Sequence, residues 1–187
     1  PGVSNDLGGD AGFDLKYGLT SGLTADVTYN TEFAQVEEDE QQVNLTRFSL
    51  FFPEKREFFL EGQGIFGFGG GVARGAGGGG RTSAPTLTPV LFFSRQIGLE
   101  SGQAVPIVAG GRVTGRTGDY TVGLLNISTG DSERVGAQSA NFSVVRLRRD
   151  ILRRSTIGVI ATNRSPRASG VDTNQAYGVD ANLAFFE

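Results

Sequence analysis

Apolar and polar side chains alternate through residues 11–30. The apolar positions are Phe13, Leu15, Tyr17 and Leu19 before a short break and Leu23, Ala25, Val27 and Tyr29 after it. A period of two places successive side chains on opposite faces, which is typical of a β-strand. The break at 20–22, Thr-Ser-Gly, suits a three-residue loop, so the pattern predicts an antiparallel hairpin.

One register puts all of these apolar residues on a single face of the hairpin. It pairs Phe13 with Tyr29, and a shift by one residue would mix the two faces. The same register sets Lys16 opposite Asp26 on the other face. We therefore expect an ion pair between Lys16 and Asp26.

Strand patterns return in the second half of the chain. We expect strands within residues 91–98 (LFFSRQIG), 107–128, 139–149, 154–163 and 174–187. Between 107 and 128, the Gly-Asp pair at 118–119 suits a tight two-residue turn. This turn places Val113 and Leu124 on one face and Arg112 on the other.

Two segments break the alternation. Leu45, Phe48 and Phe52 follow a helical spacing, and the acidic run before them suits a helix N-terminus. We expect a short helix or plug-like segment near 39–52. Residues 62–88 are rich in glycine and predict a flexible loop.

The strands together predict an all-β fold of antiparallel, up-and-down strands that forms part of a transmembrane β-barrel. Several strands approach the ~9–11 residues that cross a bilayer at a tilt. A soluble β-sandwich is the alternative, because lipid-facing and core-facing strand faces are both apolar. The expected lumen-facing residues are Lys16, Asp26, Arg112 and Arg116. The expected lipid-facing or core-facing residues are Phe13, Leu15, Tyr17, Leu19, Leu23, Val27 and Tyr29.

Composition narrows the chemistry. The 187 residues contain no cysteine and no histidine, which excludes disulfides, thiolate catalysis and the commonest metal ligand and general base. The net charge of −3 gives no electrostatic basis for binding nucleic acid. We expect no cofactor. Because the chain starts at Pro1 and stops within a predicted strand, we expect residues 1–187 to be one barrel domain truncated at both ends.

The run NLTRFSLFFPEKREFFLEG at 44–62 resembles a signature of a barrel-like outer-membrane domain of unknown function from Gram-negative bacteria. Segments 12–40, 91–98, 148–165 and 176–187 resemble the same family in the same order. The resemblance implies an outer-membrane location, with lipid and the remainder of the barrel as partners. In that family the domain commonly follows a family-nine carbohydrate-binding module, so the module and its glycan are further expected partners.

Acidic and basic clusters supply the candidate chemical sites. Glu37, Glu38, Asp39 and Glu40 could offer oxygen ligands to Ca²⁺, although their spacing differs from that of an EF-hand and a solvated acidic turn is the default. The candidate catalytic carboxylates are Glu54, Glu57 and Glu61. A basic cluster near a predicted turn could bind phosphate or lipid headgroups, or could be ordinary barrel-rim charge: Arg146, Arg148, Arg149, Arg153 and Arg154.

The sequence supports functional hypotheses from different classes. The leading hypothesis is an outer-membrane barrel segment that supports transport, surface display or anchoring of a carbohydrate-handling module. One alternative is a surface-associated, carbohydrate-active hydrolase that uses the carboxylates at 54–61, since carboxylate chemistry needs no histidine. Another is a soluble β-sandwich binding module. We favour a non-enzymatic role.

Overall fold

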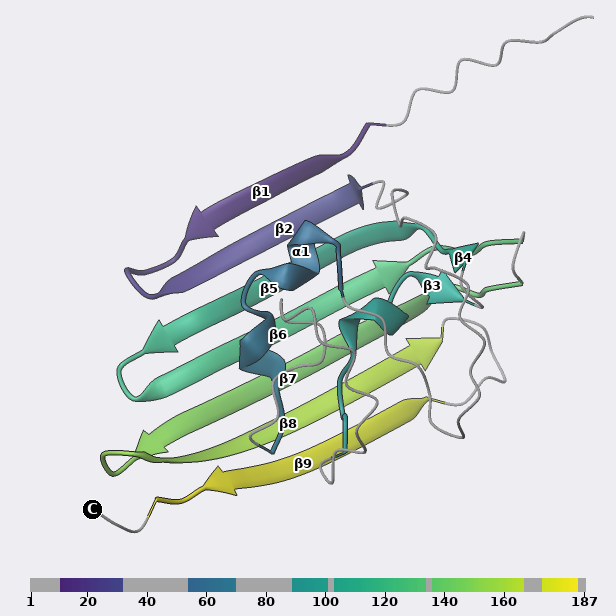
Figure 1. Ribbon diagram of the computed structural model, residues 1–187. Coiled ribbons are helices and arrows are strands. Elements are labelled where there is room, and N and C mark those ends of the chain that lie inside the picture. The colour runs from purple at the N-terminus through teal and green to yellow at the C-terminus, as the bar shows by residue number, and fades with distance from the viewer. Residues whose placement is uncertain are drawn as a thin grey trace, which may run out of the picture.

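A computed structural model describes residues 11–31, 54–69, 89–100, 103–133, 136–166 and 173–184. Most of them form one antiparallel sheet of seven strands, in the order β1-β2-β5-β6-β7-β8-β9 (Figure 1). The strands are β1 Phe13–Gly18, β2 Leu23–Thr31, β5 Ile107–Thr117, β6 Tyr120–Thr129, β7 Ala140–Ile151, β8 Ser155–Pro166 and β9 Asn174–Asn182. The predicted all-β, up-and-down arrangement is confirmed. β1 and β9 lie at the two edges, so the described strands form an open sheet.

The β1–β2 hairpin has the predicted register. Phe13 pairs with Tyr29, and their rings stack with centroids 5.8 Å apart. Lys16 lies opposite Asp26. The period-two pattern and the loop at 20–22 were sufficient to define this hairpin, because only one register keeps the apolar side chains on one face.

The predicted turn between β5 and β6 is also confirmed. Thr117 pairs with Tyr120 and Val113 with Leu124, so residues 118–119 form the two-residue connection. Gly118 has φ 55°, a left-handed conformation that glycine adopts without steric cost. β7, β8 and β9 fall on the three C-terminal segments expected from the sequence.

Between β2 and β5, the described residues 54–69 and 89–98 lie over one face of the sheet (Figure 1). The chain between these two strands contains α1 Glu57–Leu60, η1 Gln63–Phe66, η2 Ser94–Gln96 and a two-stranded sheet of β3 Leu99–Glu100 and β4 Gln103–Ala104. We call residues 54–69 and 89–98 the inner segment, the sheet face they cover the inner face, and the opposite face the outer face. The core between them contains Phe59, Phe66, Ile97, Ile107, Leu125, Ile127, Val144 and Ile160.

The inner segment differs from the sequence expectations. The strand predicted at 91–98 is wrong: the chain forms η2 there, and the Ser94 carbonyl accepts a hydrogen bond from Arg56 rather than from a neighbouring strand. The first residues of the expected loop at 62–88 form η1, with Phe66 buried. Residues 70–88 of that loop and the expected helix at 39–52 lie outside the described residues. In the part of the chain that is described, no helix is long and apolar enough to span a membrane.

Candidate functional site

Charged side chains of the seven-stranded sheet gather on its inner face. Strand pairing places there Asp14, Lys16, Asp26, Arg112, Arg116, Arg146, Arg148, Asp150, Arg164 and Asp180. Among the described strand residues, Arg149 is the one charged side chain on the outer face. The sheet thus directs its charges toward the inner segment and away from the uncovered side.

The outer face is apolar and exposed. Its exposed large side chains are Phe13, Leu15, Tyr17, Val27, Tyr29, Tyr120, Leu124, Val145, Leu147, Ile157, Val159, Tyr177 and Val179. The exposure reaches the middle of the sheet, where Leu124 of β6 is 40% exposed and Val145 of β7 is 47% exposed. Contiguous apolar surface of this kind marks a site that contacts a membrane or another protein.

The apolar band runs obliquely across the strands. On β2 it reaches Tyr29, whereas the residues aligned with Tyr29 on β6 and β7 are Ser128 and Asn141. At that end of β6 and β7 the outer face is polar instead. Side-chain hydrogen bonds of 2.8–3.1 Å join Asn126, Ser128, Asn141 and Ser143.

Arg112 fixes α1 to the inner face. Its guanidinium, almost fully buried, donates to Asp26 through Nε at 3.1 Å and through Nη2 at 2.6 Å. Nη1 donates to the backbone carbonyls of Phe58, within α1, and of Glu61, at the C-cap of the helix. The guanidinium also lies 5.1 Å from the centroid of the Phe58 ring. A single side chain of β5 therefore satisfies a buried carboxylate and two helix carbonyls.

Glu61 extends this network to the edge strand. Its carboxylate pairs with Lys16 of β1 and accepts a hydrogen bond from Arg112 at 3.1 Å. The hydrogen bond from Lys16, with the charges of Lys16 and Arg112, holds the pKa of Glu61 below its ordinary value. The expected ion pair between Lys16 and Asp26 is replaced: Asp26 pairs with Arg112, and Lys16 with Glu61.

Glu54 and Arg56 join the two parts of the inner segment. Both side chains are buried, and they pair through two parallel hydrogen bonds of 2.8 Å. The Ser94 hydroxyl donates to Glu54 at 2.7 Å, and Arg56 donates to the carbonyls of Ser94 and Ile97. Burial by itself raises the pKa of Glu54, but the hydrogen bonds and charge of Arg56, with the Ser94 hydroxyl, lower it below the ordinary value.

A third buried pair lies toward β9. Arg146, 1% exposed, donates to both carboxylate oxygens of Asp180, at 2.5 and 2.8 Å. The backbone N–H of Gly69 donates to the same carboxylate at 3.2 Å, and the Phe68 ring lies 6.0 Å from the guanidinium. The stretch 54–69 is therefore bound to the sheet at Gly69 as well as at α1.

Glycines on the inner face provide room for the inner segment. A Cβ at Gly123 would lie 2.8 Å from Ile65 and 2.9 Å from Phe66, and one at Gly178 would lie 2.6 Å from both Phe68 and Leu91. Side chains of the inner segment thus rest directly on the backbone of the sheet. Gly123 and Gly178 are therefore packing positions within their strands.

The structure separates the predicted sets by face. Lys16, Asp26, Arg112 and Arg116 lie together on the inner face. Of the predicted apolar set, Leu19 lies in the β1–β2 connection and the others lie on the outer face. Whether these faces meet a lumen and a lipid remains a prediction. The burial of Glu54 with Arg56 was missed, because alternating charges at a loop tip carry no signal of a partner about 40 residues away.

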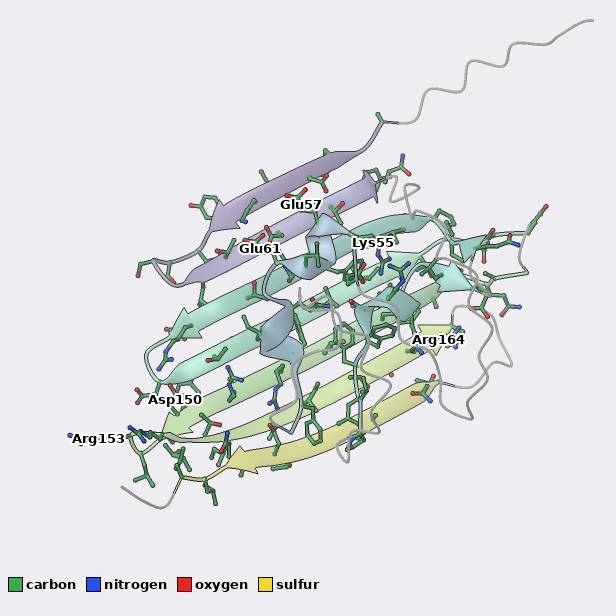
Figure 2. The ribbon with its side chains drawn as sticks, in the orientation of Figure 1. Lys55, Glu57, Glu61, Asp150, Arg153 and Arg164 are labelled. Carbon is green, nitrogen blue, oxygen red and sulfur yellow. The ribbon has the colours of Figure 1, made fainter. Side chains whose placement is uncertain are left out.

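The candidate chemical sites do not form one constellation. Glu54 is enclosed by its partners, Glu61 is held by two cations, and Glu57 is exposed on α1 (Figure 2). Within the described ranges, no group of acidic residues could hold a metal ion, and the candidate ligands at 37–40 lie outside those ranges. The arginine cluster is split: Arg146 and Arg148 face inward, Arg149 faces outward, and the other two occupy the β7–β8 turn.

Comparison with known proteins adds a family without an assigned activity. A family model described as "Domain of unknown function (DUF5916)" matches residues 4–184. No curated protein and no solved structure matches the chain.

Proposed function

The chain belongs to the DUF5916 family of domains of unknown function, and we propose that it forms part of the wall of an outer-membrane β-barrel. In this proposal the outer face contacts lipid and the inner segment covers the lumen side. The domain anchors a surface-acting or carbohydrate-handling module rather than acting as an enzyme.

The observation that carries the proposal is the distribution of charge between the two faces. A charged side chain on the lipid-facing side of a barrel strand costs about 2–4 kcal/mol at the bilayer midplane, whereas the lumen side accepts charge. Within the described strands of the seven-stranded sheet, Arg149 at one end of β7 is the one charged side chain on the outer face, and the other charged side chains lie on the inner face. In a soluble sandwich, a second layer would have to cover Leu124 and Val145.

Strand length and the slope of the apolar band support the same proposal. β2 and β5 to β9 are 9 to 12 residues long, which suits a tilted crossing of the hydrocarbon core. Barrel strands tilt by roughly 35–45° from the barrel axis, so a bilayer would cross them obliquely. The displacement of the band between Tyr29 on β2 and the polar Ser128 on β6 follows that slope.

The connections alternate in the manner of outer-membrane barrels. The links at 19–22, 118–119 and 152–154 are short and lie at one end of the sheet, whereas those at 32–106, 130–139 and 167–173 are longer and begin at the other end. In such barrels the short turns face the periplasm. The proposal therefore places the β7–β8 turn on the periplasmic side.

Anchoring, rather than open conduction, is favoured by the way the inner segment is held. Arg112 of β5 donates to the carbonyls of Phe58 and Glu61, and Asp180 of β9 accepts from the backbone of Gly69. Within the sheet, Arg112 and Asp180 are themselves members of the buried pairs Arg112–Asp26 and Arg146–Asp180. Removing one partner of a buried pair leaves an uncompensated charge and costs about 3–5 kcal/mol. A segment held by such contacts closes the space beside the wall. Of the three carboxylates named for the hydrolase alternative, Glu54 and Glu61 are held by cations, which leaves Glu57 without a free second carboxylate from this set.

The test compares one charge at two outer-face positions. Val145→Arg places a cation in the centre of the apolar band, and Thr117→Arg places the same cation at its edge. In a bilayer, Val145→Arg should lower stability by about 2–4 kcal/mol and Thr117→Arg by about 0–1 kcal/mol. In an aqueous protein both exposed positions should stay within about 0.5 kcal/mol.

The measurement is the amount of heat-modifiable, folded protein in isolated outer membranes, made with the complete protein. We expect wild type and Thr117→Arg to assemble and Val145→Arg to be depleted severalfold. Equal assembly of the two variants, or wild-type protein that fractionates without membranes, would overturn the proposal.

A further inference from the structure

We propose that the outer face of β7, β8 and β9, toward the β7–β8 turn, forms a binding site for an anionic phospholipid. The acyl chain lies on an apolar hollow, and the phosphate lies at the adjacent arginines. This inference rests on the proposed membrane location and names a specific partner for one part of the outer face. The site is defined by the hollow, by Arg149 and by the β7–β8 turn at 152–154.

The acyl-chain part is a shallow hollow of about 350 Å³ on the outer face. Its lining is almost wholly apolar and comes from Val145, Val159, Ile160, Ala161, Tyr177, Gly178 and Val179. Tyr177 and Val179 are 72% and 77% exposed, so their side chains project beside the small residues Ala161 and Gly178. An elongated hydrocarbon chain can lie along these small residues between the projecting side chains.

The headgroup part begins one step farther along the same strands. Leu147 pairs with Val159, and the next outward residue of β7 is Arg149, paired with Ile157. The Arg149 guanidinium lies 5.3 Å from the centroid of the Tyr120 ring, which holds it over the outer face. Arg149 is thus a cation at the border of an otherwise uncharged apolar surface.

The turn beyond Arg149 adds charge and an exposed apolar residue. Figure 2 shows Arg153 projecting from this end of the sheet, with Arg164 at the opposite end. Leu152 is 81% exposed and has φ 61°, a strained conformation for a leucine. The exposed apolar side chain of Leu152 is better accommodated in a membrane interface than in water.

Charge complementarity favours an anionic headgroup over a zwitterionic one. The carboxylate of Asp150 points to the inner face and is paired with Arg116, so it does not neutralise Arg149. Asp119 lies in the neighbouring turn, but no acidic residue lies on the outer face of the described strands. Each basic residue near an anionic membrane surface contributes about 1 kcal/mol.

The experiment measures lipid retention by native mass spectrometry on the complete protein in a mild nonionic detergent. Phosphatidylglycerol, phosphatidylcholine and free glycerol phosphate are added in separate titrations. We expect phosphatidylglycerol to be retained most tightly and glycerol phosphate not to be retained. Arg149→Gln should weaken phosphatidylglycerol binding about fivefold, and Arg149→Gln with Arg153→Gln should weaken it further.

Two control variants separate the parts of the site. Arg164→Gln removes a cation at the opposite end and should leave retention unchanged, whereas Tyr177→Ala should weaken both lipids because it opens the hollow. Equal retention of the two lipids by wild type, equal effects of Arg149→Gln and Arg164→Gln, or retention of glycerol phosphate alone would overturn the lipid site. If the lipid site is overturned in this way while the wild-type protein still assembles in a heat-modifiable form, the barrel proposal stands.

Discussion

Arg146 of β7 reaches diagonally over Gly158 of β8 to pair with Asp180 of β9. The pair joins strands that are not neighbours in the sheet, and the glycine between them makes the path possible. A Cβ on Gly158 would lie 2.7 Å from Nη1 of Arg146 and 2.9 Å from Oδ1 of Asp180. The absence of one side chain thus permits a bond across three strands.

Gly158→Ala should therefore destabilise the protein by about 1–3 kcal/mol, the usual effect of forcing extra volume into a packed site. The displacement also weakens the Arg146–Asp180 pair. The free energy of unfolding from denaturant titration in detergent measures the effect. Gly111→Ala, at a position with no atom within 4 Å of an added Cβ, is the matched control and should be nearly neutral.

Arg112→Met should be among the most destabilising single substitutions in the described sheet. It leaves Asp26 buried without its cation and removes the donor to the carbonyls of Phe58 and Glu61. We expect a loss of about 3–5 kcal/mol in the free energy of unfolding. Arg116→Gln, which removes an exposed pair with Asp150, should cost no more than about 1 kcal/mol. Similar losses for both variants would contradict a clamp at Arg112.

Glu54 should make the inner segment sensitive to acid. Its pKa in the folded protein is lowered, so its contribution to stability is complete above the ordinary glutamate pKa and is lost as pH falls through the lowered value. Stability measured from neutral pH down into that acidic range should fall more steeply in wild type than in Glu54→Gln. Glu57→Gln changes an exposed carboxylate of the same segment and should keep the wild-type slope.

Gly123→Val should release part of the inner segment without unfolding the sheet. The new side chain would occupy the positions of Ile65 and Phe66 against β6. Limited proteolysis should then cut within 54–69 several times faster than in wild type. Gly111→Val, on the outer face of β5, tests whether any valine has this effect. Unchanged cleavage in Gly123→Val would show that the glycine is not a packing position.

The hairpins were predictable because their information is local. The strict alternation from Phe13 to Tyr29 and the turn residues at 118–119 define both the strands and their register. Neighbouring positions in the sequence are neighbours in these structures. The face of each strand then follows from the period of two.

The inner segment was not predictable by the same means. Residues 91–98 contain an apolar run that favours a strand, but Ser94 and Ile97 give their carbonyls to Arg56, far away in the chain. The predicted ion pair was also wrong. Lys16 and Asp26 lie opposite each other, but Lys16 pairs with Glu61 and Asp26 pairs with Arg112. Competition between long-range partners leaves no periodic trace in the sequence.

The direct pairing of β2 with β5 bears on the order in which the sheet assembles. β5 to β9 are joined by comparatively short connections, whereas Thr31 and Ile107 pair across the whole stretch that carries the inner segment. Closing that longer loop carries a larger entropy loss, so contacts between near neighbours in the chain should form first. We therefore expect β5 to β9 to associate before β2 pairs with β5, so that the β1–β2 hairpin docks on a sheet that is already formed.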